Sequence, residues 1–333
     1  LGDVYKRQLL LSLFPFLVVS RLLIQCPESD LLALPFRLAA WGIGIRTPCA
    51  ARVLCIGFLG GFAPAASAAA QAVRTGQLTA EEADALLPAC ICSGPSFVVL
   101  TVGQSLLGSA ELGVLLFASQ ITANYLTAAL LNRFAGVRSV KLGSAAPASP
   151  APPRLDEILA DAAITYCKLC GFILFFRMLA AGAGALLPAD AGTLCSILLE
   201  VCSGCDLASR TGRWGSLLCC AALSVQGLSV LLQVRTICPP EMTLRPLYRA
   251  RMLHLPLSLA LFYLLLPGGE ADVFSTLPAR VLLMRRVPPD CALLVFAVCC
   301  MAVCTLRSGI RQVEQKQMAR NAGGCCINSK TLL

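Results

Sequence analysis

The sequence predicts an all-α polytopic integral membrane protein. The chain has 333 residues, of which 57% are hydrophobic and only 14% are charged, and its mean hydropathy is +0.76. A soluble domain carries roughly 25% charged residues, so this composition argues against a soluble protein. The apolar runs are too long and too continuously apolar for the strands of a barrel, which leaves helices as the way to satisfy the backbone in lipid. We expect roughly seven or eight hydrophobic segments.

The first membrane half is predicted over residues 9–134. Residues 1–8 resemble translated linker sequence and do not begin with Met, so we expect a non-native or truncated N-terminus there and exclude it. The apolar stretches of this half are 9–26, a shorter interfacial piece at 31–41, 53–73, 85–110 and 112–132.

Two local patterns refine this half. Thr79 and Glu82 have the spacing of a capping box, which predicts a short amphipathic helix that ends near Leu87. Gln120, Asn124 and Thr127 recur at helical spacing in the stretch 112–132. We expect this polar face to turn toward the bundle or a wet cavity, because lipid cannot solvate it.

A linker and a second membrane half follow. Residues 135–155 are basic and rich in Pro and Ala, and we place them in the cytoplasm. The second half is predicted over residues 156–306, with apolar stretches at 157–187, 191–205, 214–234, 252–269 and 291–306. Residues 307–333 form a basic, polar C-terminal tail.

Several apolar stretches contain helix-breaking residues. The candidate structural breaks are Gly60, Gly61, Pro64, Pro95 and Gly204. In addition, residues 94–99 of the first half resemble residues 227–232 of the second. Broken segments at corresponding positions of two halves are typical of a transporter-like binding site. The alternative is that Gly and Ser recur by chance or serve tight helix packing.

The candidate substrate-binding residues lie around these breaks: Gly94, Ser96, Glu200, Gln226, Gly227 and Ser229. Breaks at Gly94 and Gly227 would expose helix N-termini, whose free N–H groups and positive dipole ends can hold a polar solute. Glu200 is either a ligand for a substrate or coupling ion, or a member of a structural ion pair with Arg177.

The order and spacing of several short motifs resemble the sporulation integral membrane protein YlbJ family, a branch of the nucleoside-recognition or Gate domain proteins. The motifs are Phe14-Pro15-Phe16-Leu17, Gly60-Gly61-Phe62, Gly76-Gln77-Leu78-Thr79, Ser93-Gly94-Pro95-Ser96-Phe97, Gln226-Gly227-Leu228-Ser229-Val230 and Gln233. The chain departs from the family pattern in Gly61-Phe62-Ala63-Pro64-Ala65-Ala66, where the Pro is shifted in position and the second Gly is lost. It also has Arg21 where the family often has an acidic residue.

The resemblance implies two Gate-type repeats with broken or re-entrant helices, in the bacterial cytoplasmic membrane, the forespore membrane included. It also implies a sporulation-associated protein that binds or transports a small solute, nucleoside-like or ionic. Its partners would then be the lipid bilayer and that unidentified solute. The alternative is a non-transporting scaffold in spore envelope or cortex assembly, which would recruit spore-assembly proteins through the basic linker and tail.

We expect neither catalysis nor a cofactor. The sequence has no metalloprotease, nucleophile-elbow or phosphate-loop motif, and His254 is its single histidine. Most of the 19 cysteines stand in apolar runs, which favours structural cysteine over a metal site. Lys and Arg stand at the ends of apolar runs, which is the placement that the positive-inside rule produces in membrane proteins. We therefore attribute the net charge of +9 to membrane topology and expect no nucleic-acid partner.

Overall fold

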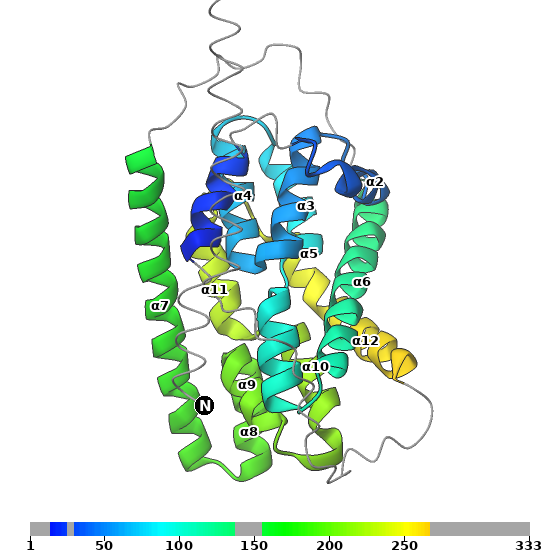
Figure 1. Ribbon diagram of the computed structural model, residues 1–333, viewed down its shortest axis with the longest axis vertical. Coiled ribbons are helices and arrows are strands. Elements are labelled where there is room, and N and C mark those ends of the chain that lie inside the picture. Colours follow the sequence, from blue (N-terminus) through cyan, green and yellow to red (C-terminus); the bar gives the residue numbers. More distant parts are fainter. Residues whose placement is uncertain (1–13, 25–29, 137–154, 267–333) are drawn as a thin grey trace, which may run out of the picture. The chain divides into compact units, whose positions relative to one another are not determined.

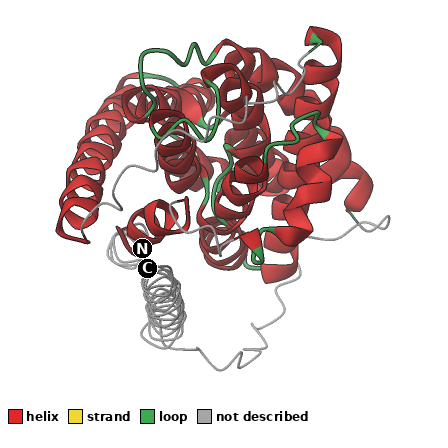
Figure 2. Ribbon diagram, turned by 90° about the horizontal axis from the view of Figure 1, so that it is seen from above, coloured by secondary structure: helices red, strands yellow, loops and turns green. Residues whose placement is uncertain are grey.

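The structure is a computed structural model that describes residues 14–24, 30–136 and 155–266 (Figure 1). Within these ranges it is built of helices and contains no strand, so the all-α prediction is confirmed there (Figure 2). Several predictions lie outside the described residues: the N-terminus at 1–8, most of the linker at 135–155, the apolar run at 291–306 and the tail at 307–333.

The helices of the first half follow one another in short pieces. They are the helix Phe14–Ile24, α2 (Leu34–Gly42), α3 (Pro48–Gly60), α4 (Phe62–Arg74), α5 (Ala80–Cys90), the π-helix η2 (Ser96–Leu106) and α6 (Ala110–Ala135). The second half contains α7 (Leu155–Leu186), α8 (Ala189–Leu199), α9 (Val201–Ala208), the 3₁₀ turn η3 (Gly212–Trp214), α10 (Gly215–Val225), α11 (Gly227–Ile237) and α12 (Arg245–Leu265).

Three stretches of the described chain are long and apolar enough to cross a membrane: α6, α7 and Gly212–Ile237. Shorter apolar helices accompany them at Phe14–Ile24, Pro48–Gly60, Ser96–Leu106 and Ala189–Leu199. These helices agree with an integral membrane protein, whereas the expected total of roughly seven or eight segments stays a prediction. The apolar stretches predicted at 53–73, 85–110 and 191–205 each contain an interruption between two helices.

The helix α7 lies along the edge of the described bundle, where it packs on α8 and α11 (left in Figure 1). Its outward side chains are large and apolar, since Leu174, Phe175 and Met178 are all more than half exposed. Such a face suits lipid, because a water-soluble protein seldom leaves so continuous an apolar surface open.

The predicted capping box at the start of α5 is confirmed. The Thr79 hydroxyl accepts the Glu82 N–H at 3.1 Å, and the Glu82 carboxylate accepts the Thr79 N–H at 3.2 Å. The helix continues past Leu87 to Cys90, with Pro88 inside it. Leu87 and Cys90 are fully buried, so tertiary packing stabilises a turn that local sequence disfavours.

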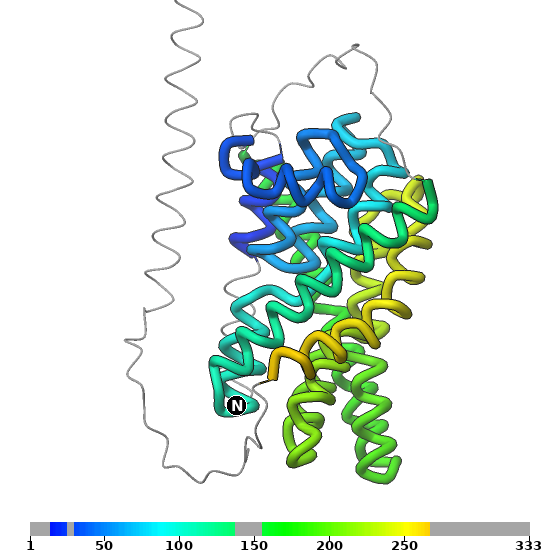
Figure 3. Tube along the Cα trace, turned by 90° about the vertical axis from the view of Figure 1, so that its right-hand side faces the viewer, coloured from blue at the N-terminus to red at the C-terminus, as the bar shows by residue number. Residues whose placement is uncertain are grey.

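The polar face of α6 points into the bundle, as its spacing predicted. Gln120, Asn124 and Thr127 are each at most 3% exposed. The Gln120 amide donates to the Ser224 hydroxyl of α10 at 2.9 Å. Figure 3 shows α6 and α12 running side by side, and the two helices are in contact. Gln120 therefore lies where α6 meets α10 and α12, whereas Asn124 donates to the Ile91 carbonyl at the end of α5.

The helices η2 and α6 pack closely against each other in the first half. A Cβ added at Gly103 would lie 2.4 Å from the Gly113 Cα, and one added at Gly113 would lie 2.8 Å from the Val99 Cα. Real Cβ atoms do not sit this close to backbone, so the two helices are in backbone contact.

We predict that Gly113→Ala destabilises the protein, because the added methyl group forces η2 and α6 apart. Overpacking of this kind costs about 1–3 kcal/mol, so thermal unfolding in detergent should shift down by several degrees. Gly171→Ala in α7 is the matched control, since a Cβ there meets nothing within 4 Å. Equal unfolding midpoints for the two variants would contradict the close contact.

Candidate functional site

Four helix interruptions surround the candidate site. The first separates α3 from α4 at Gly61, where φ is +82°, and the second separates α5 from η2 over residues 91–95. In the second half, Glu200 separates α8 from α9 with an extended backbone. Gln226 and Gly227, with φ of 62° and 70°, separate α10 from α11.

The interruptions meet in pairs, backbone against backbone. A Cβ added at Gly61 would lie 2.7 Å from the Gly94 nitrogen. A Cβ added at Gly227 would lie 2.9 Å from both the Glu200 nitrogen and the Leu199 carbonyl carbon. Only glycine combines this proximity with a left-handed backbone. A bulky residue at Gly227 would therefore test helix packing rather than contact with a solute.

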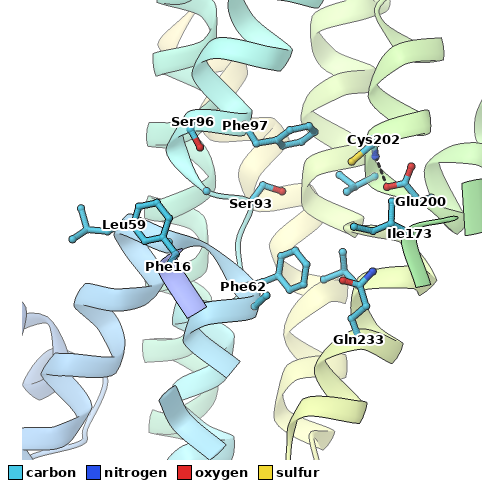
Figure 4. A pocket seen from close by; sticks show the side chains of 15 residues that line it. Phe16, Leu59, Phe62, Ser93, Ser96, Phe97, Ile173, Glu200, Cys202 and Gln233 are labelled. Atoms are coloured by element: carbon cyan, nitrogen blue, oxygen red, sulfur yellow. Dashed lines mark hydrogen bonds between the residues drawn. The ribbon is translucent and has the colours of Figure 1, made fainter. Parts of the chain in front are cut away.

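A cavity of about 80 Å³ lies between the two pairs of interruptions (Figure 4). The first turns of α4, η2 and α9 all contribute to its wall. Its lining residues are Phe16, Leu59, Gly60, Phe62, Ala63, Ser93, Gly94, Ser96, Phe97, Ile173, Glu200, Val201, Cys202, Val230 and Gln233. Both halves of the chain therefore supply the wall.

The helix N-termini at the cavity differ in how they are capped. No side chain caps α4 or η2. In contrast, the Glu200 carboxylate accepts the Cys202 N–H at 2.9 Å (Figure 4). It also accepts the Ser203 N–H at 2.7 Å and the Ser203 hydroxyl at 2.9 Å. Glu200 is only 2% exposed and caps the N-terminus of α9, the helix that follows it. Neither of the two roles considered from the sequence, a ligand for a solute or ion and an ion pair with Arg177, included this capping.

Gln233 presents an acceptor to the cavity. Its side chain is 1% exposed, and its amide Nε2 donates to the Ser229 hydroxyl at 2.9 Å. Its Oε1 atom has no hydrogen-bond partner among the residues that the structure describes. In Figure 4 this amide points toward the space between Phe62 and Ile173. A buried, unpaired carbonyl oxygen is costly, so a donor on a bound solute would be stabilising here.

The structure separates the six predicted binding residues into two groups. Gly94, Ser96 and Glu200 line the cavity. Gln226, Gly227 and Ser229 do not line it, although they support its wall. Gln226 precedes the first turn of α11, Gly227 contacts the other interruption, and Ser229 accepts the hydrogen bond from Gln233.

The five candidate breaks also fall into two groups, those at an observed helix interruption and those inside a helix. Gly60 ends α3, Gly61 stands between α3 and α4, and Pro95 immediately precedes η2. Pro64 lies inside the first turn of α4, where proline needs no hydrogen-bonded N–H. Gly204 lies inside α9, because the interruption comes earlier, at Glu200.

The site predicted from the sequence did not include Gln233 or the aromatic rings of Phe62 and Phe97, which line the cavity. One signal pointed to Gln233: it stands four residues after Ser229, so the two polar groups share a helix face in an apolar run. No pattern singled out the rings, since phenylalanine in a membrane helix is unremarkable by sequence.

Comparisons of the chain with protein-family models, with curated proteins and with solved structures find no match.

We predict that Glu200→Ala lowers the stability of the protein, because two N–H groups in the first turn of α9 and the Ser203 hydroxyl lose their acceptor. Loss of a helix N-cap costs about 0.5–2 kcal/mol, measurable by unfolding in detergent. Glu200→Ser is the matched control, because serine is itself a favoured N-cap and should restore most of the loss. An unfolding midpoint for Glu200→Ala equal to that of the wild type would contradict this capping role.

Proposed function

We propose that this protein binds a small, neutral, polar solute in the cavity and moves it across the bacterial cytoplasmic membrane. The observation that carries the proposal is the meeting of the first turns of α4, η2 and α9 at a cavity into which the unpaired Gln233 Oε1 points. Such a cavity offers hydrogen-bond donors and an acceptor within a largely apolar wall, as small-molecule sites do.

The charges at the cavity favour a neutral solute over an anion. Helix N-termini attract negative charge, but the buried Glu200 carboxylate already occupies the end of α9. A second negative charge beside it would be repelled at low dielectric. The uncapped ends of α4 and η2 can still donate to a carbonyl or hydroxyl oxygen of the solute.

The wall also favours a planar group. Phe16, Phe62 and Phe97 supply aromatic surface to the cavity, and aromatic rings pack well on other flat rings. A nucleoside carries a planar base, N–H and O–H donors, and carbonyl acceptors without a net charge. We therefore propose a nucleoside-like solute, whose binding requires the surrounding helices to move apart and widen the cavity beyond its present volume of about 80 Å³.

The order of the helices supports two Gate-type repeats. In each half, two interrupted helix pairs are followed by a long helix: α3/α4, α5/η2 and α6 in the first, and α8/α9, α10/α11 and α12 in the second. The helix Phe14–Ile24 and α2 precede the first set, and α7 precedes the second. Repeats with interrupted helices around a central site are the architecture of alternating-access transporters. Rocking of one repeat against the other would expose the cavity to each side in turn.

We predict that purified protein binds tritiated uridine or adenosine in a scintillation proximity assay. Gln233→Leu should weaken this binding about tenfold or more, because one buried hydrogen bond is lost. Gln104→Leu is the matched control, since Gln104 lies exposed on η2. The proposal fails if neither nucleoside binds, or if both variants bind as the wild type does.

The sporulation role implied by the family resemblance is part of this proposal. In a spore-forming host without its own YlbJ-like protein, the wild-type chain should restore heat-resistant spores, and Gln233→Leu at matched membrane level should not. Equal rescue by both would favour the scaffold alternative, which depends on the linker and tail outside the described residues.

A further inference from the structure

Arg251 is a buried cation that the proposed solute site does not use. It stands in α12, its exposed fraction is 7%, and it does not line the cavity. Within the described part of the chain no carboxylate forms a salt bridge with it. A buried charge without an ionic partner is expensive, so its surroundings must stabilise it in another way.

The C-terminal ends of two interrupted helices surround this guanidinium group. One nitrogen donates to the Ile91 carbonyl at 2.7 Å, where α5 ends, and another donates to the Ser224 carbonyl at 3.4 Å, near the end of α10. The last carbonyls of a helix have no partner within the helix and carry its negative dipole end. Arg251 therefore neutralises two converging helix ends at once.

Neighbouring groups complete the polar cluster without supplying a negative charge. The Asn124 amide also donates to the Ile91 carbonyl, at 3.3 Å. His254 Nε2 lies 3.2 Å from the Gln120 carbonyl oxygen, which can only accept, so this nitrogen carries the proton. The nearest acceptors for Arg251 are thus backbone carbonyls.

Carbonyls at the ends of interrupted membrane helices are the groups that hold Na⁺ in cation-coupled transporters. We propose that Arg251 occupies a latent monovalent-cation site at the ends of α5 and α10, as a built-in cation. The protein then needs no free cation at this place, and removal of the guanidinium group creates a site for one. This inference rests on the Arg251 contacts alone and not on the identity of the solute.

The test is thermal unfolding of the purified full chain in detergent, followed by the fluorescence of its two tryptophans. Chloride salts of Na⁺ and K⁺ are compared with N-methylglucamine chloride at constant ionic strength. Wild type should respond equally to all three salts. Arg251→Ala should unfold at lower temperature and regain about 3 °C or more in Na⁺ or K⁺, because a ligand of the folded state stabilises it.

Two further variants make the result decisive. Arg249→Ala, at an exposed position of the same helix, should respond as the wild type does. Arg251→Lys keeps a cation in place and should also be insensitive to the salt. A folded Arg251→Ala without cation response overturns the proposal, and so does a specific response of the wild type or of Arg251→Lys. If Arg251→Ala does not fold, Arg251→Gln, which also removes the charge, is measured in its place with the same expected outcome.

Discussion

The structure depends on pairing the backbone groups that helix interruptions leave open in an apolar interior. Each interruption frees N–H groups on one side and carbonyl groups on the other, and an unpaired group costs free energy in a dry environment. Buried polar side chains pair with several of them. Glu200 accepts from the first turn of α9, and Arg251 donates to the ends of α5 and α10. Asp84 accepts the Thr243 and Leu244 N–H groups ahead of α12, at 2.8 and 3.1 Å.

The N-terminal and C-terminal ends of the interrupted helices face different surroundings. Three N-terminal ends face the cavity, and the unpaired Oε1 of Gln233 belongs to the same wall. Glu200 caps the end of α9, whereas no side chain caps α4 or η2. Two C-terminal ends face Arg251, on α12 and away from the cavity wall. Since helix N-termini are positive and C-termini negative, this separation places positive helix ends at the cavity and negative helix ends beside the guanidinium group of Arg251.

Glycine makes the arrangement sterically feasible. The interruptions touch through Gly61 and Gly94 in one half, and through Gly227 and the backbone at Glu200 in the other. In lipid the hydrophobic effect does not drive helices together, so close packing between backbones contributes much of the association. The contact of η2 with α6 through Gly103 and Gly113 follows the same rule. Hydrogen bonds from polar side chains and close backbone contacts at glycine therefore occur at neighbouring positions.

Features that depend on local chemistry could be predicted from the sequence alone. Low charge and long apolar runs predicted helices, the spacing of Thr79 and Glu82 predicted a cap, and the spacing of Gln120 and Asn124 predicted an inward polar face. The position of one interruption and the composition of the cavity wall depend on tertiary contacts. Tertiary structure moved one interruption from Gly204 to Glu200, because the carboxylate could cap α9. It also brought Gln233 to the cavity and Arg251 to two distant helix ends, contacts that no local spacing encodes because their partners lie far away in the chain.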